Sequence, residues 1–154
     1  SNNHMGPLID KDAVKMYVQS IEACKKEGGN FIVEGGILEG AGYESGCYVK
    51  PCIAEAKPQY QIVQHETFAP ILYLLKYKTI EEAIAIQNGS DFGLTAGIHS
   101  LDAVELELWL DRVEAGNLYV NRGITGAIVQ RQPFGGWKRS VVGATAKAGG
   151  PTYL

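Results

Sequence analysis

Apolar residues near the start of the chain recur with the spacing of an α-helix. After Asp10, apolar side chains follow at steps of three or four residues, at Val14, Tyr17, Val18 and Ile21. Gly28 and Gly29 then end the pattern. Because residues at these steps share one face of a helix, the pattern predicts a helix that buries this face.

Two strands are predicted after this helix. The apolar run 31–33 is closed by Gly35 and Gly36, and the glycines at 40, 42 and 46 indicate a mobile or tightly turned loop. A second strand is predicted from Tyr48 to Ala54. Pro51 lies inside it and cannot donate a ladder hydrogen bond, so we expect an edge strand or an irregular one.

The region 71–121 alternates strand patterns with helix patterns. The run 71–75 is apolar without alternation, which is typical of a strand covered on both faces. Thr79 to Glu82 has the form of a capping box, so a helix is predicted over Ile80–Asn88, where Asn88 and Gly89 stop it. A further strand is predicted over 94–100.

Ser100 is expected to cap the next helix, which ends before Gly116. Its buried stripe is predicted to consist of Leu106, Trp109, Leu110 and Val113. A strand over 117–121 completes the alternation. The fold class is therefore predicted as α/β, a layered and mainly parallel sheet with crossover helices. Ligands of such sheets gather outside the carboxyl ends of the strands, where the segment from Asn121 onward begins.

Length and composition limit the class of protein. A chain of 154 residues favours one compact domain, and no apolar run approaches the roughly 20 residues of a membrane span. Ser1 to Met5 look like a remnant of recombinant expression, so the domain is assigned to residues 6–154. Three cysteines, an odd number, fit free thiols in a reducing compartment, so a cytoplasmic protein is expected, with no membrane partner.

Charge is distributed unevenly along the chain. Residues 1–114 carry nine Lys or Arg against seventeen Asp or Glu, a net charge of −8, whereas residues 115–154 carry five basic side chains, eight glycines and no acid. A glycine-rich basic segment lets backbone amides approach a ligand and favours an anionic one. Five charges without interleaved aromatic residues are weak grounds for a nucleic-acid partner, and we expect none.

The histidines provide no convincing catalytic group. His4 lies in the expected remnant, and His99 ends a predicted strand, where an exposed surface position is expected. His65 adjoins Glu66, but neighbours in sequence need not share a site, so catalysis there is a minority hypothesis.

The cysteines are better explained as structural thiols than as nucleophiles. Cys24 is predicted at the polar margin of the first helix, where Lys25 and Lys26 could lower its pKa slightly, although a partly buried small hydrophobe is the favoured interpretation. Cys47 and Cys52 flank a predicted strand, and their spacing does not match zinc-binding pairs. We therefore expect no metal.

The segment His65-Glu66-Thr67-Phe68-Ala69-Pro70 precedes the strand predicted at 71. On composition alone, a loop in which Pro70 sets the direction and Phe68 fills the core is favoured. The functional alternative is that the carboxylate of Glu66 accepts two hydrogen bonds from ribose hydroxyls, while Phe68 supports a flat ring.

Four landmarks in order resemble the C-terminal part of an aldehyde dehydrogenase and cover nearly the whole chain. They are Met5-Gly6-Pro7-Leu8-Ile9, then residues 65–71, then Gly116-Asn117-Leu118-Tyr119-Val120-Asn121, then Gln132-Pro133-Phe134-Gly135-Gly136. Within that superfamily, residues 121–129 and 147–154 are similar to Δ1-pyrroline-5-carboxylate (L-glutamate γ-semialdehyde) dehydrogenases, free-standing or as the second half of the proline-utilisation protein. Residues 65–73 are also similar to α-aminoadipic semialdehyde dehydrogenases, which remain the alternative.

The resemblance implies roles for five residues. Glu66 would bind the nicotinamide-ribose hydroxyls of NAD, with NADP not excluded, and Phe68 would pack beside the same end of the cofactor. Gly126 and Ala127 would belong to a loop that anchors the carboxylate and amine of the substrate through main-chain amides, and Phe134 would line the aldehyde tunnel. An acidic semialdehyde and a dinucleotide agree with the acid-free segment.

The resemblance also implies what this chain lacks. The family's reaction is attack of a cysteine thiolate on the aldehyde, hydride transfer to NAD(P)+, and hydrolysis of the thioester assisted by a glutamate base. In the family, the cysteine, the glutamate and the nucleotide-binding domain precede Met5, so the fragment alone is expected to be inactive. A missing oligomerisation segment after Leu154 would leave apolar surface exposed, so a homo-oligomer is expected. A non-catalytic binding or assembly module is the alternative of another class.

One position departs from the family pattern. Ala69 stands where most members have glycine. We expect its methyl group to be tolerated unless the position requires a positive φ.

Overall fold

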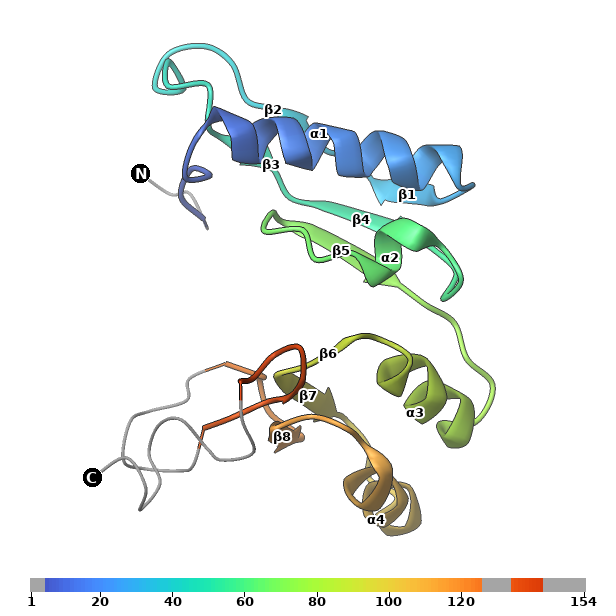
Figure 1. The fold of residues 1–154 in the computed structure, drawn as a ribbon. Coiled ribbons are helices and arrows are strands. Elements are labelled where there is room, and N and C mark those ends of the chain that lie inside the picture. Colours follow the sequence, from blue (N-terminus) through green and yellow to red (C-terminus); the bar gives the residue numbers. More distant parts are fainter. Residues whose placement is uncertain (1–4, 126–133, 143–154) are drawn as a thin grey trace, which may run out of the picture. The chain divides into compact units, whose positions relative to one another are not determined.

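The computed structural model describes residues 5–125 and 134–142, and the chain divides after Lys76 into two compact units (Figure 1). The first unit contains α1 (Lys11–Lys26), β1 (Asn30–Val33), β2 (Gly36–Ile37), β3 (Val49–Lys50), β4 (Cys52–Glu55), α2 (Gln61–Gln64) and β5 (Ile71–Leu74). The second contains α3 (Ile80–Asn88), β6 (Phe92–Gly93), β7 (Thr95–Ile98), α4 (Ala103–Arg112), β8 (Asn117–Val120) and β9 (Trp137–Lys138). The predicted α/β class is confirmed.

The sheets are small and mixed. In the first unit the strand order is β1-β4-β5, with β1 antiparallel and β5 parallel to β4, while β2 and β3 form an antiparallel pair. In the second unit β7 and β8 are parallel, and β6 and β9 are antiparallel. The crossover β7-α4-β8 is as predicted. Within the first unit, β5 pairs in parallel with β4.

The first helix begins and ends where its sequence signals predict. The Asp10 carboxylate accepts the Ala13 amide at 2.8 Å and caps α1, and the buried face carries Val14, Tyr17 and Ile21 as expected. Two details differ from the prediction. Val18 is exposed, and Cys24 is fully buried instead of lying at a polar margin. Cys24 follows Tyr17 by seven residues and Ile21 by three, so it lies on the same buried face.

The strands around Pro51 are irregular, as predicted, because β3 ends before the proline and β4 begins after it. Pro51 therefore removes no ladder bond. The edge position is wrong for β4, which is the central strand of its sheet. Strand β5, by contrast, lies at an edge of this three-stranded sheet. Leu72 and Leu74 on it are exposed, so the predicted coverage of both faces of this strand is wrong for the described residues.

Helix α3 has the predicted bounds, and its cap follows the predicted motif. Thr79 Oγ accepts the Glu82 amide at 3.2 Å, and the Glu82 carboxylate accepts the Lys78 amide at 2.7 Å. Gly89 is the C-cap. Both amides would otherwise lack an acceptor at the helix N-terminus, so this local motif alone can determine where the helix starts.

The cap of α4 is Asp102 and not the predicted Ser100. The Asp102 carboxylate accepts the amides of Val104 at 2.8 Å and Glu105 at 3.3 Å, whereas Ser100 Oγ accepts the Asp102 amide. An aspartate has the further advantage of a negative charge at the positive end of the helix. The four residues of the predicted buried stripe are buried to different extents. Trp109 and Val113 are buried, Leu106 is half-buried and Leu110 is exposed.

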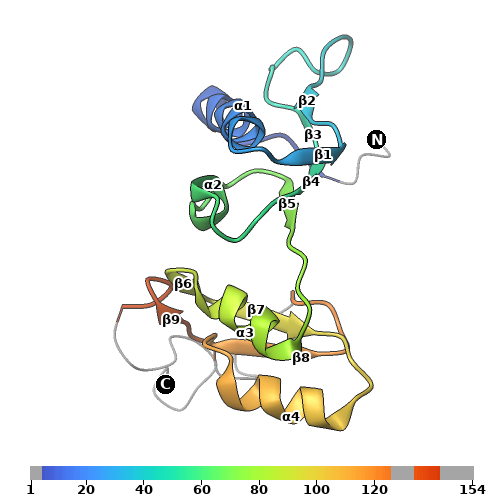
Figure 2. The same cartoon turned by 90° about the vertical axis from the view of Figure 1, so that its right-hand side faces the viewer.

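The core of the second unit lies between its helices and one side of β7 and β8 (Figure 2). Its buried members are Ile84, Ala96, Trp109, Val113 and Ala115. A two-stranded sheet covers only a narrow face of α4, which explains why Leu110 stays outside. Among the described residues, none of the helices is both long and apolar enough for a membrane span.

The buried Tyr17 and the half-buried Tyr73 make the stability of the first unit depend on pH in the alkaline range. Tyr17 is fully buried, donates to the Lys50 carbonyl at 2.6 Å and accepts the Gly36 amide at 2.9 Å. Burial raises the pKa of Tyr17 from 10.0 to about 12 and that of Tyr73 likewise to about 12. Between pH 10 and about pH 12, these tyrosines are therefore deprotonated in the unfolded chain and still protonated in the folded chain.

We therefore expect these two tyrosines to lower the free energy of unfolding as the pH rises above about 10. The slope is at most about 1.4 kcal/mol per pH unit for each tyrosine. Urea denaturation at several alkaline pH values, with a spectrophotometric tyrosine titration, measures both quantities. Tyr17→Phe should remove about half of the slope, and an unchanged slope in that variant would contradict the assignment.

Candidate functional site

The predicted cofactor residues lie in the first unit, on the loop between α2 and β5. Glu66 and Phe68 are both exposed, Phe68 to 81%. Thr67 between them faces inward, where its Oγ1 lies 3.2 Å from Ser20 Oγ on the buried face of α1. The structure thus brings Glu66 and Phe68 together on one surface loop, and the composition-based alternative in which Phe68 fills the core is wrong for the described chain.

The backbone of this loop is fixed on both sides. The Ala69 amide donates to the Thr67 carbonyl at 2.8 Å, and the Cys52 amide donates to the Pro70 carbonyl at 3.0 Å. Ala69 packs against the core cluster of α1, and its φ is not positive. The methyl group that departs from the family pattern is therefore accommodated without backbone strain.

The chemistry of this loop fits the ribose end of a dinucleotide. None of the described residues forms an ion pair with the Glu66 carboxylate, so its oxygens are available to hydroxyl donors. Phe68 offers an exposed aromatic face two residues away. Glu66 and Phe68 are the described residues that would hold NAD.

The carboxyl ends of β7 and β8 shape the start of the predicted anchor loop. Asn121 has a positive φ of 54° and forms two hydrogen bonds with the backbone of Ser100, accepting from its amide at 3.0 Å and donating to its carbonyl at 2.9 Å. Asparagine tolerates this left-handed backbone better than most residues. Arg122 then stacks on Tyr119, with its guanidinium carbon 5.1 Å from the ring centre.

Two of the three predicted substrate residues, Gly126 and Ala127, lie outside the described residues. The third, Phe134, is half-buried in the second unit and starts the segment 134–142.

The backbone after Phe134 is clamped onto the start of β8. The Asn117 side-chain nitrogen donates to the Gly135 carbonyl at 2.7 Å and to the Leu94 carbonyl at 2.9 Å. Gly116 lies directly beneath, and a Cβ placed there would be 2.1 Å from the Gly135 oxygen. Only a glycine at 116 permits so close a backbone approach.

The side chains of Ser140 and Lys138 hold the rest of the segment in place. Ser140 Oγ accepts the Gly93 amide at 3.0 Å. Lys138 Nζ forms an ion pair with Glu114 at 2.7 Å and donates to the carbonyls of Asn88 and Ser90. Lys138 thereby satisfies carbonyls at the C-terminal end of α3, which a cation stabilises.

The thiols do not have the environment of a nucleophile. All three cysteines are free, and Cys24 and Cys52 are buried. Burial is the main cause that raises the pKa of each of these two thiols, so they stay protonated. The slight lowering by Lys25 and Lys26 predicted for Cys24 is wrong, because desolvation outweighs any attraction to these exposed ammonium groups.

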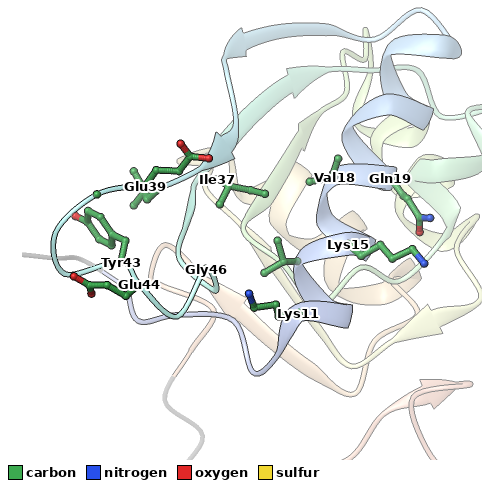
Figure 3. A pocket seen from close by; sticks show the side chains of 12 residues that line it. Lys11, Lys15, Val18, Gln19, Ile37, Glu39, Tyr43, Glu44 and Gly46 are labelled. Atoms are coloured by element: carbon green, nitrogen blue, oxygen red, sulfur yellow. The ribbon is translucent and has the colours of Figure 1, made fainter.

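A groove of about 790 Å3 lies in the first unit between α1 and the loop that joins β2 to β3 (Figure 3). Its apolar lining comes from Val14, Val18, Ile37 and Leu38. Lys11 and Lys15 line it from α1, and Glu39 and Glu44 from the loop. Neither Glu66 nor Phe68 lines this groove, so it is separate from the predicted cofactor loop.

Sequence reasoning missed the polar residues that hold these loops, chiefly Ser20, Asn117, Lys138 and Ser140. One signal was available: Ser20 occupies an apolar-face position of α1 between Tyr17 and Ile21. A polar residue at such a position must find a hydrogen-bond partner. Its partner across the fold could not be named from spacing.

Comparison with known proteins gives consistent similarities. The family model that matches, over residues 1–154, is that of the aldehyde dehydrogenase family. A 1-pyrroline-5-carboxylate dehydrogenase of Geobacillus sp. (strain WCH70) is 41% identical over 97% of this chain, which spans 28% of that protein. The chain thus covers little more than a quarter of that relative's length.

Solved structures agree with this similarity. A 1-pyrroline-5-carboxylate dehydrogenase from Thermus with bound NAD is 36% identical with a TM-score of 0.83, over 93% of this chain and 27% of that one. Proline utilization A from Corynebacterium freiburgense is 46% identical with a TM-score of 0.78, over 88% of this chain and 14% of that one.

Proposed function

Since the chain belongs to the aldehyde dehydrogenase family, we propose that residues 6–154 are a C-terminal portion of the catalytic domain of an enzyme that oxidises L-glutamate γ-semialdehyde to L-glutamate. The observation that carries this proposal is the similarity, over 97% of the chain, to a 1-pyrroline-5-carboxylate dehydrogenase. The acid-free composition of residues 115–154 supports an acidic substrate.

NAD is the proposed cofactor, and it would accept the hydride when bound. Glu66 would hold ribose hydroxyls and Phe68 would pack beside the same end of the cofactor. The exposure of both residues on one fixed loop supports these roles. A similar Thermus protein carries bound NAD, which supports the choice of cofactor.

The chain alone is proposed to be inactive. Its two buried thiols have raised pKa values, and the remainder of the enzyme would supply the reacting cysteine. Exposed apolar side chains such as Leu101 and Val142 support association, either with that remainder or with further copies in a homo-oligomer. Free thiols support a cytoplasmic location.

Steady-state kinetics of the full-length enzyme tests the proposed substrate. We expect NADH formation with L-glutamate γ-semialdehyde, and a kcat/KM at least about tenfold below it for α-aminoadipic semialdehyde, since one methylene is worth about 10- to 200-fold in a fitted pocket. A reversed preference would establish the alternative substrate, and no oxidation of either compound would overturn the proposal.

Replacing Ala127 by leucine is expected to raise KM for the semialdehyde by about tenfold or more. A bulky side chain in the anchor loop would keep the substrate carboxylate from the main-chain amides, and each lost charge-assisted bond costs about 1.5–3 kcal/mol. Initial rates over a range of aldehyde concentrations give the value. Ala127→Gly, which adds no volume, is the control, and an unchanged KM in Ala127→Leu would remove the anchor-loop assignment.

Replacing Glu66 by glutamine is expected to raise KM for NAD by about five- to tenfold, with KM for the aldehyde changed less than twofold. The amide keeps the shape but replaces one of two acceptor oxygens by a donor and removes the charge. His65→Gln, at the adjacent exposed position, is the matched control. Equal effects of both variants would contradict a specific role of Glu66.

A further inference from the structure

A buried asparagine stands at the start of β8, where a strand core would ordinarily hold an apolar residue. Asn117 is 4% exposed. Its side-chain nitrogen donates to two carbonyls, Leu94 at 2.9 Å and Gly135 at 2.7 Å, which fixes the orientation of the amide. None of the described residues donates to its Oδ1. An apolar side chain would avoid the cost of this unpaired oxygen, so the value of the amide lies in its two donated bonds.

The two carbonyls belong to segments that sequence order does not bring together. Leu94 precedes β7, and its carbonyl already accepts the Asn117 backbone amide at 3.0 Å. Gly135 lies 18 residues after Asn117 and directly follows Phe134. The Asn117 amide therefore ties the backbone beside Phe134 to the parallel pair β7–β8, the most regular part of the second unit.

The contact at Gly135 is also tight. Gly116 has no side chain, and the Gly135 and Gly136 backbone lies against it. The hydrogen bond from the Asn117 side chain to the Gly135 carbonyl holds this backbone in close contact with Gly116. Phe134 itself takes part in an isolated β-bridge, and the contacts at Trp137, Lys138 and Ser140 lie further along the chain.

We propose that Asn117 is a positioning residue that sets the affinity of the full-length enzyme for its aldehyde, by fixing the Gly135 carbonyl and so the backbone that carries Phe134. This inference rests on the proposed role of Phe134 in the aldehyde tunnel. It names a buried residue that does not itself touch the substrate.

The test is Asn117→Asp in the full-length enzyme. Aspartate has the same shape, but it donates no hydrogen bond when ionised and one when protonated, so at least one of the two carbonyls loses its donor. KM for the aldehyde is expected to rise about ten- to a hundredfold, because a small displacement of a positioning segment has effects of this order. KM for NAD should change less than twofold and kcat less than about threefold.

Asn88→Asp is the matched control. Asn88 also joins two segments of the second unit, donating to the Arg112 carbonyl at 2.8 Å and accepting the Glu114 amide at 2.9 Å, but its side chain does not contact residues 134–136. Its melting temperature should fall as in Asn117→Asp, with KM for the aldehyde unchanged. A rise of the aldehyde KM in both variants, or in neither, would overturn the inference.

Two further measurements separate this inference from the proposed function. The kinetics use whichever aldehyde the unchanged enzyme oxidises fastest, so a different preferred substrate overturns the proposed substrate and leaves Asn117 tested. Hydrogen–deuterium exchange of residues 134–136 should accelerate in Asn117→Asp and not in Asn88→Asp, whatever the activity, and equal exchange there would refute the positioning role. Asn117→Ser, whose hydroxyl can donate one bond, serves if the aspartate variant does not fold.

Discussion

Replacing Gly116 by alanine is expected to lower kcat/KM of the full-length enzyme for its aldehyde by about a hundredfold. The new Cβ would lie 2.1 Å from the Gly135 oxygen, 2.4 Å from its carbonyl carbon and 2.6 Å from the Gly136 Cα. These are backbone atoms, which cannot rotate away as a side chain can, so the segment after Phe134 must move. A displacement of about 1 Å at a positioning segment costs about a hundredfold in rate.

Initial-rate kinetics with both substrates measure this effect, and Gly6→Ala is its control. A Cβ at Gly6 meets no atom within 4 Å, so that variant should keep the activity of the unchanged enzyme. Circular dichroism should show that Gly116→Ala retains its helices. Full activity of Gly116→Ala would mean that the placement of residues 135 and 136 has no bearing on catalysis.

Replacing Trp109 by alanine is expected to lower the free energy of unfolding of the second unit by about 3–5 kcal/mol. Trp109 is 2% exposed, joins α4 to the core that includes Ile84 and Ala96, and its indole nitrogen lies 3.4 Å from the Gln87 side-chain oxygen. A loss of this size is a large part of the stability of a small domain.

Urea denaturation followed by tryptophan fluorescence measures this loss, since both tryptophans belong to the second unit. Trp137→Ala is the matched control: Trp137 is 49% exposed, so its removal should cost less than about 1 kcal/mol. Equal losses in the two variants would show that the core around Trp109 does not hold the unit together.

Helix positions followed from the sequence with good agreement. The bounds of α1 and α3 agree with the predicted ones because an aspartate or threonine cap and a terminal glycine act within a few residues. The predicted cap of α4, Ser100, was wrong, because Asp102 two residues later caps the helix. Local sequence signals thus predict that a helix is present more reliably than they predict the residue at which it begins.

The exposure of strands did not follow from the sequence. The apolar run at 71–75 predicted a strand covered on both faces, yet in the first unit β5 is an edge strand with Leu72 and Leu74 exposed, and β4, which follows Pro51, is central. Whether a strand has one neighbour or two depends on chain segments far from it, and no periodicity within the strand records that number. The burial of Cys24 is different, because Cys24 follows Tyr17 by seven residues and Ile21 by three, so helical spacing alone puts it on their face.

For the candidate site, ordered local motifs predicted the family, and the family match over the whole chain confirms it. The same motifs predicted roles for five residues, which stay predictions: Glu66, Phe68, Gly126, Ala127 and Phe134. What only the tertiary structure decided is how part of this set is held. Asn117 reaches Gly135, Ser140 reaches Gly93 and Lys138 reaches Asn88 across 18, 47 and 50 residues. Caps and motifs act over a few residues and can be read from sequence, whereas hydrogen bonds between distant segments exist only once the chain has folded.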